Sequence, residues 1–141
     1  MKNIVTPLIY KQQQYPEYGV CKKTGKIHSC KQGSWRPRAE KVSGGSPYPN
    51  IVLSLNSKHK KTISVHVAVH ETLNPELPRL PGVTESQWRR TPKSVKLHVR
   101  ELYQVNHIDH NPLNFAPHNL EWTTAMQNVQ KYQEFRKKAH A

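Results

Sequence analysis

The fold of this chain is decided by residues 104–131, which read QVNHIDHNPLNFAPHNLEWTTAMQNVQK. His107 follows Asn106 directly, Asn119 comes 12 residues after His107, and Asn128 comes 21 residues after it. The loop between His107 and Asn119 is rich in proline and asparagine, which favour turns over regular secondary structure. The run thus combines an imidazole and several amides with residues that turn the chain back on itself.

The same run predicts two strands followed by a helix. Thr124 is a plausible N-cap, and Gln127 three residues later completes a capping box. Asn128 would then lie in the first helical turn, on a face that can meet the first strand. The predicted elements are a strand over 104–109, an exposed loop over 110–118, a strand over 120–123 and a helix from 125 to about 138.

This pattern resembles the HNH branch of the His-Me finger nucleases, in particular the phage and intron-encoded HNH homing endonucleases. The resemblance is clear over 104–130, where Asn-His-Ile-Asp and Asn-Leu-Glu-Trp-Thr occur in order. Further support comes from 18–29, which is similar to a small module often found ahead of HNH cores, and from 51–75. His110 departs from the family pattern, in which glycine is typical at this position.

The resemblance implies a role for each position of the motif. His107 matches the general base that activates water, and Asn106 and Asn128 match the ligands of one divalent cation, Mg²⁺ or Mn²⁺. Asn119 matches the residue that braces the loop by backbone hydrogen bonds. We expect Asp109 to form hydrogen bonds in the loop or at the end of the first strand, and a role in supporting the metal ligands is the alternative. Many members have aspartate in place of Asn106, so weaker metal binding is expected here.

These residue types suit the hydrolysis of a phosphodiester bond. A neutral imidazole, whose ordinary pKa is about 6.5, can take a proton from the attacking water. A hard divalent cation held by one or two protein oxygens can stabilise the charge on the leaving oxygen. Because neighbouring strand residues point to opposite sides, Asn106 and His107 need a local bend or strand twist to serve one site.

The residues before the motif predict a β-rich module. Strand-forming residues indicate hairpins over 18–29 and 51–66, and Gly25 permits the positive φ that the first turn needs. Val65, Val69 and Leu73 recur at helical spacing and predict a short helix over 65–73, which Asn74-Pro75 ends.

The segment after this helix is longer than the usual connection in the family. Thr84 and Gln87 fit a capping box for a short helix, and the run 94–103 is compatible with either a helix or an extended piece. Three roles are consistent with this segment: an arm that contacts DNA, an oligomer contact, or simple packing against the core. At the other end of the chain, residues 1–17 show little periodicity. Residues 4–10 contain enough apolar side chains to pack as a short element, and we expect residues 12–14 to lead the chain away from it.

We therefore expect an α+β fold, with N-terminal β-hairpins and a short helix followed by a C-terminal ββα-metal (His-Me finger) core. The predicted parts are a basic, β-rich DNA-binding module over 1–75, an insertion or connection over 76–103, and the HNH nuclease core over 104–141.

The chain is strongly basic, with a formal net charge of +13. Residues 1–61 hold 12 Lys and Arg against 2 Asp and Glu, whereas residues 62–141 hold 10 against 7. Each phosphate that a cation neutralises releases counterions, so a polyanion is the natural partner, and we expect double-stranded DNA. The candidate phosphate contacts are Lys22, Lys23, Lys26, Lys31, Arg36, Arg38, Lys41, Lys58, Lys60, Lys61, Arg89 and Arg90.

Other classes of protein fit the composition less well. No apolar run approaches the roughly 20 residues needed to span a bilayer, so we expect no membrane partner. Two cysteines, Cys21 and Cys30, are too few for a disulfide framework. They favour the cytoplasm, which is that of the host if the chain is phage-encoded. With His28 they lack an evident fourth ligand, so structural zinc is not expected. For His66 and His70 we expect packing and capping roles.

The predicted function is a metal-dependent DNA endonuclease of HNH type, similar to homing endonucleases, that hydrolyses phosphodiester bonds in double-stranded DNA. One alternative is a non-catalytic DNA-binding protein that keeps the ββα shape. Another is an accessory nuclease subunit of a phage DNA-processing or packaging assembly. The sequence does not decide between a DNA and an RNA target, between nicking and double-strand cleavage, or between a monomer and a dimer.

Overall fold

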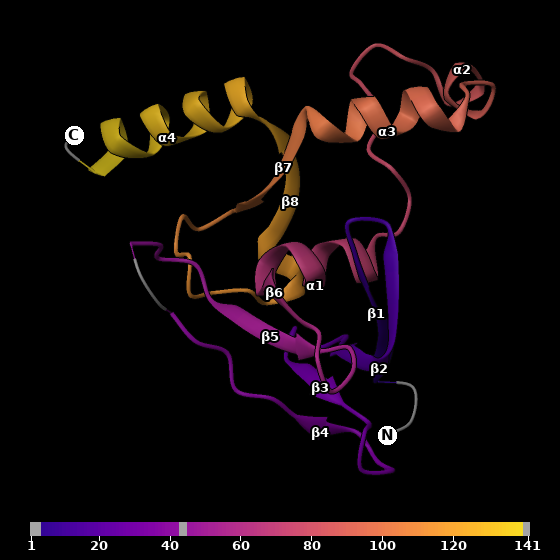
Figure 1. The fold of residues 1–141 in the computed structure, drawn as a ribbon. Coiled ribbons are helices and arrows are strands. Elements are labelled where there is room, and N and C mark those ends of the chain that lie inside the picture. The colour runs from indigo at the N-terminus through magenta and orange to yellow at the C-terminus, as the bar shows by residue number, and fades with distance from the viewer. Residues whose placement is uncertain (1–3, 43–44, 140–141) are drawn as a thin grey trace. The chain divides into compact units, whose positions relative to one another are not determined.

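The computed structural model describes residues 4–42 and 45–139, except for the side chains of residues 128, 129, 131, 132, 135 and 139. It confirms the predicted α+β class: the N-terminal strands and a short helix come first, and two strands and a helix end the chain (Figure 1).

The contacts within the chain divide it into two compact units. The first unit contains residues 1–75 and 107–121, and the second contains residues 76–106 and 122–141. His107 therefore belongs to the first unit and Asn106 to the second, and the peptide bond between them joins the two.

The first unit begins with a sheet in which β1 (Val5–Tyr10), β2 (Gln13–Cys21), β3 (Ile27–Ser29) and β4 (Arg36–Pro37) lie in that order. The predicted hairpin over 18–29 is confirmed, because β2 and β3 pair in an antiparallel register. Gly25 in its turn has a φ of +77°, as predicted. A Cβ there would also lie only 2.5 Å from the backbone oxygen of Phe115, so this turn contacts the loop of the HNH motif.

The sequence does not predict the hairpin between β1 and β2, and the expectation that residues 12–14 lead the chain away is wrong. Tyr10 pairs with Gln13, so the turn contains only Lys11 and Gln12. Their φ angles are +49° and +69°, the sign that a type I′ hairpin turn needs at both positions. Lysine and glutamine seldom adopt this conformation, so the usual Gly or Asn signal is missing.

A second hairpin, of β5 (Asn50–Ser54) and β6 (Lys60–Ser64), leads into helix α1 (Val65–Leu73). The predicted hairpin and the predicted helix are both confirmed. The predicted ranges overlapped at residues 65–66, and the structure assigns both residues to the helix.

Helix α1 packs against β1, β2 and β6. Val65, Ala68 and Val69 on the helix are at most 1% exposed, so they form the centre of the core of the first unit. Near the end of α1, Thr72 Oγ1 accepts a 2.9 Å hydrogen bond from the Ile9 N–H and donates a 3.1 Å bond to the Ile9 carbonyl. This exchange ties α1 to the edge strand β1.

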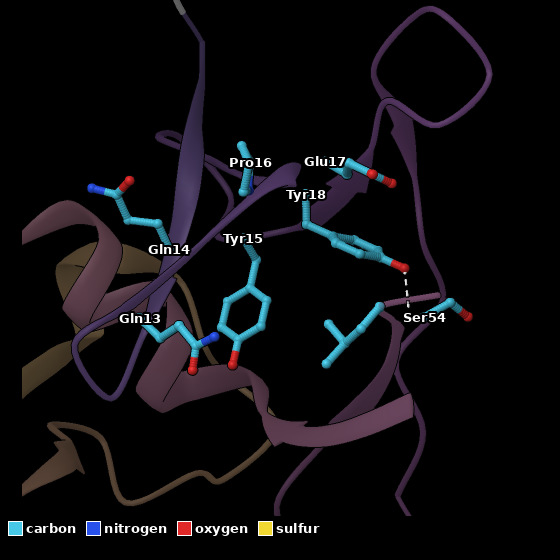
Figure 2. Close-up of a pocket in the computed structure, with 8 residues that line it drawn as sticks. Gln13, Gln14, Tyr15, Pro16, Glu17, Tyr18 and Ser54 are labelled. Carbon is cyan, nitrogen blue, oxygen red and sulfur yellow. Dashed lines mark hydrogen bonds between the residues drawn. The ribbon is translucent and has the colours of Figure 1, made fainter. Parts of the chain in front are cut away.

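Tyr18 links the first sheet to the second hairpin. It points from β2 toward β5, and its hydroxyl oxygen accepts a 2.9 Å hydrogen bond from the N–H of Ser54 (Figure 2). Tyr15 lines the same pocket of about 240 Å³, and its hydroxyl has no hydrogen-bond partner among the described residues. The pocket contains no residue of the HNH motif; the rest of its lining is Gln13, Gln14, Pro16, Glu17 and Leu55.

The second unit contains three helices, α2 (Glu85–Arg89), α3 (Lys93–Glu101) and α4 (Ala125–Ala139). The predicted capping box is present at Thr84, whose hydroxyl accepts a hydrogen bond from the Gln87 N–H. Most of the run 94–103 is helix rather than extended chain. Within the described ranges, no helix is long and apolar enough to cross a membrane.

Strands β7 (Tyr103–His107) and β8 (Leu120–Thr124) form a two-stranded sheet and are joined through the short 3-10 helix η1 (Pro117–Asn119). Because β7 ends at His107, Asp109 lies in the following turn rather than in the predicted strand. In the second unit, the rings of Trp122 and Tyr103 are in edge-on contact, with their centroids 6.5 Å apart. The Arg100 guanidinium lies over the Trp122 ring, 4.4 Å from its centroid. These contacts hold the start of β7 against β8.

The core of the first unit predicts different effects for two leucines on one hairpin. Leu53 is fully buried, whereas Leu55 is 43% exposed. Leu53→Ala should lower the free energy of unfolding by about 3 kcal/mol, because it leaves a cavity among packed side chains. Leu55→Ala should change it by less than about 0.5 kcal/mol. Urea unfolding followed by circular dichroism measures both, and equal effects would contradict the described core.

Candidate active site

The imidazole of His107 lies in a cluster of three rings in the first unit. Its centroid is 4.8 Å from that of His66 at the start of α1, and 5.6 Å from that of Tyr48 in the loop before β5. Tyr48 and His66 are themselves 4.9 Å apart, and the Tyr48 ring is stacked on both imidazoles. His107 is 4% exposed and His66 is 8% exposed, so both imidazoles are buried.

Burial favours the neutral form of both histidines. Burial, together with the neighbouring imidazole of His107, lowers the pKa of His66 to about 4. Burial also lowers the pKa of His107, although the Asp109 carboxylate acts in the opposite direction. Nδ1 of His66 and Nε2 of His107 are buried without a hydrogen-bond partner among the described residues. A neutral His107 retains a lone pair for a proton.

The turn after His107 is held by the carboxylate of Asp109. This carboxylate accepts hydrogen bonds of 2.8 Å from the Asn111 N–H, 2.8 Å from the Asn114 amide and 2.9 Å from the Asn119 amide. The Asp109 N–H in turn donates to Asn119 Oδ1 at 3.1 Å. His110 adopts the left-handed backbone conformation, with a φ of +60°, at the position where the HNH pattern typically has glycine.

Asn119 connects both ends of this loop. Besides its contacts with Asp109, its amide donates a 2.8 Å bond to the carbonyl of Asn114, and its own carbonyl accepts a 2.7 Å bond from the Ile108 N–H. Both the oxygen and the nitrogen of its side-chain amide therefore form hydrogen bonds, and the residue is 5% exposed. These contacts fix the loop immediately after His107.

The hydrogen bonds from Asn114, Asn111 and Asn119 lower the pKa of Asp109 from 3.8 to about 2. Because the pKa in the folded protein lies below that in the unfolded chain, these bonds stabilise the fold above about pH 4. That stabilisation is lost as the pH falls through about 2, when the carboxylate becomes protonated.

The two predicted metal ligands both belong to the second unit. Asn106 precedes His107 in β7 and is 8% exposed. Neighbouring strand residues point to opposite sides, yet neither Asn106 nor His107 is exposed to solvent, because the last three residues of β7 are all buried. Asn128 lies in the first turn of α4, but its side chain is outside the described residues. The start of α4 is capped as predicted, with Gln127 N–H donating to Thr124 Oγ1 at 3.2 Å.

The donor types determine which cation fits. Amide oxygens, which asparagines such as Asn106 and Asn128 carry, are neutral, hard donors of the kind that Mg²⁺ or Mn²⁺ accepts. Across the described residues, no three or more His, Cys, Asp or Glu side chains are grouped to hold a metal ion. Cys21 and Cys30 are both free thiols.

Several of the candidate phosphate-binding residues already have partners in the first unit. Lys26 forms a 2.9 Å salt bridge with Glu40, and Lys31 lies 3.5 Å from Glu17 and donates to the Ser54 carbonyl. Arg38 lies over the Tyr18 ring and Lys61 over the Tyr10 ring. In the second unit, Arg90 Nε donates a 3.4 Å hydrogen bond to the Ser86 carbonyl at the end of α2. The remaining candidates are Lys22, Lys23, Arg36, Lys41, Lys58, Lys60 and Arg89.

The sequence does not predict that Tyr48 and His66 lie beside His107. His66 was expected to have a packing role, which agrees with its ring contacts, and His70 lies 3.3 Å from the Asn74 amide at the end of α1. The only local signal for Tyr48 is its place between two prolines, Pro47 and Pro49, which restrict the backbone of the loop.

Residues 65–130, from α1 to the first turns of α4, match the model of a family described as HNH endonuclease. This match supports the resemblance of the chain to the HNH endonucleases. A similar fold occurs in the HNH homing endonuclease I-HmuI, in a structure of its DNA binding and cleavage. The two share 23% sequence identity and a TM-score of 0.55, over 88% of this chain and 58% of that one. No curated protein matches the chain.

The loop contacts predict that Asn119 stabilises the fold more than a neighbouring asparagine. Asn119→Ala should lower the free energy of unfolding by about 2 kcal/mol, because the buried donors and acceptors around it lose their partners. Asn111→Ala is the matched control, since Asn111 is exposed and its side chain accepts only a local bond from the Leu113 N–H. It should cost about 0.5 kcal/mol. Thermal unfolding at pH 7 measures the difference, and equal costs would show that the loop does not depend on Asn119.

Proposed function

We propose that the chain is a metal-dependent endonuclease that hydrolyses phosphodiester bonds in double-stranded DNA, as HNH homing endonucleases do. The observation that carries the proposal is the neutral, buried imidazole of His107, at the end of β7 and directly before a loop braced by Asp109 and Asn119. In a family of endonucleases, an imidazole with an unused nitrogen in this position is suited to remove a proton from water.

His107 would act as the general base. Its Nε2 is buried and has no hydrogen-bond partner among the described residues, and we assign to this nitrogen the role of accepting the proton of a water molecule. The buried environment keeps the imidazole neutral, which is the form that a base requires. The Asp109 carboxylate lies two residues away and favours the imidazolium that forms once the proton has been taken.

Asn106 and Asn128 would hold one Mg²⁺ or Mn²⁺ ion through their amide oxygens. When bound, such an ion stabilises negative charge on the phosphate and on the leaving oxygen. Neutral ligands add no charge attraction to the site, so the two asparagines alone should bind the ion weakly and the DNA phosphate should complete its coordination.

The basic first unit would hold the DNA, mostly through phosphate contacts that carry no sequence information. The excess of Lys and Arg over residues 1–61 supports this assignment. One core holds one general base, so a single copy of the chain would cut one strand, and cutting both strands would take a second copy or a second event.

Replacing the base tests the proposal directly. His107→Ala should reduce the rate at which supercoiled plasmid is nicked in the presence of Mg²⁺ by about a thousandfold. His98→Ala is the matched control, because the His98 side chain is 81% exposed on α3, and it should cut like the wild type. EDTA should stop cleavage by both active proteins. Agarose gel electrophoresis over a time course measures the nicked fraction.

The same assay separates the alternatives. If the wild type binds DNA but leaves it intact with Mg²⁺ and Mn²⁺, the chain is a non-catalytic DNA-binding protein. If cleavage begins only when a partner protein is added, the chain is an accessory subunit. Equal cleavage by His107→Ala and the wild type would refute the assignment of the base.

The neutral ligand at position 106 predicts a gain of metal affinity on substitution. Asn106→Asp adds a negative charge at the proposed ligand, so the Mg²⁺ concentration for half-maximal cleavage should fall by about tenfold. Asn56→Asp makes the same change at an exposed turn between β5 and β6, where the side-chain oxygen accepts hydrogen bonds that a carboxylate can also accept, and it should leave that concentration unchanged. Electron paramagnetic resonance of bound Mn²⁺ checks the affinity without DNA. An unchanged metal dependence in Asn106→Asp would exclude Asn106 as a ligand.

A further inference from the structure

Three segments far apart in the sequence bring one ring each to the cluster around His107. Tyr48 comes from the loop before β5, His66 from the first turn of α1, and His107 from the end of β7. All three pairs of centroids lie between 4.8 and 5.6 Å apart. Each imidazole therefore contacts two other rings, and His107 is covered by both Tyr48 and His66.

The backbone supports of Tyr48 and His66 are connected to each other. The N–H of Val65, the first residue of α1, donates a 3.1 Å hydrogen bond to the carbonyl of Pro49. Pro49 directly follows Tyr48, and Val65 directly precedes His66. One backbone hydrogen bond thus fixes the spacing between the two residues whose rings cover His107.

The helix that carries His66 is itself well anchored. Val65 and Ala68, on either side of His66 and Val67 in the sequence, are at most 1% exposed. His66 is therefore held on a packed element rather than on a loop. Tyr48 is 42% exposed, so its ring covers the cluster from the solvent side.

We propose that Tyr48 and His66 are positioning residues that clamp the imidazole of His107 in the orientation its role as a base requires. An unrestrained imidazole rotates about its Cβ–Cγ bond over a broad, roughly two-fold range. Stacked rings restrict that rotation without using either nitrogen, so Nε2 of His107 stays available for water. This inference rests on the proposed function, because it assigns helpers to the proposed base.

The clamp acts through the faces of the rings, since the Tyr48 ring is stacked on His107 and the His66 ring is tilted against it. The tyrosine hydroxyl has no part in these contacts, so Tyr48→Phe should preserve the effect.

Aromatic and aliphatic replacements of similar size distinguish a clamp from general packing. Tyr48→Phe and His66→Phe should keep cleavage within a few-fold of the wild type. Tyr48→Leu and His66→Leu should lower kcat by about a hundredfold, with KM for DNA changed by less than about twofold, because misplacing a catalytic group costs rate rather than binding. His98→Leu, the same change at an exposed position, should leave both constants unchanged.

Nuclear magnetic resonance of the His107 ring protons gives a readout that does not need activity. Both Leu variants should shift these resonances, because a neighbouring ring current is removed, whereas Tyr48→Phe should retain them. Tyr48 is partly exposed, so its variants remain informative even if His66→Leu does not fold.

The outcomes separate this inference from the proposed function. If the wild type does not cut DNA but the Leu variants shift the His107 resonances, the proposed function fails and the ring cluster stands as a structural one. If the wild type cuts and the Leu variants cut equally well, His107 acts without a clamp. If Leu and Phe variants lose kcat alike, the rings act only as packing, and the inference is overturned.

Discussion

The burial of helix α1 is the constraint on which the first unit depends. Val65, Ala68 and Val69 are almost completely excluded from solvent, and the helix contacts β1, β2, β6 and η1. Because the helix carries His66 in its first turn, the hydrophobic packing that stabilises the unit also sets an aromatic ring beside His107. Stability and the geometry of the candidate base therefore have one physical source.

A second constraint acts through hydrogen bonds rather than burial. The Asp109 carboxylate and the Asn119 side chain close the loop that follows His107, and Gly25 lets the first predicted hairpin approach Phe115 in that loop. The polar groups of this loop are hydrogen-bonded, whereas two buried imidazole nitrogens of the ring cluster have no partner among the described residues. Unsatisfied buried polar groups cost free energy and are expected where a ligand or water completes them.

Under the proposed function, DNA binding and metal binding support each other. The neutral amides of Asn106 and Asn128 would hold a divalent ion weakly by themselves, and DNA held by the basic first unit would supply the phosphate oxygens that they lack. Cleavage would then depend on the presence of substrate, since neither the ion nor the attacking water would be fully held without it.

The sequence by itself predicted those features that depend on near neighbours in the chain. The capping boxes at Thr84 and Thr124 join residues three apart, and the turn at Gly25 depends on one φ angle, so local patterns were enough. The hairpin at Lys11 and Gln12 escaped prediction because neither residue is typical of positive φ. Tyr48 lies 59 residues before His107 and His66 lies 41 before it, with no periodicity that connects them. Only the tertiary structure decided that their rings meet, because the packing of α1 and the path of the loop before β5 determine that contact.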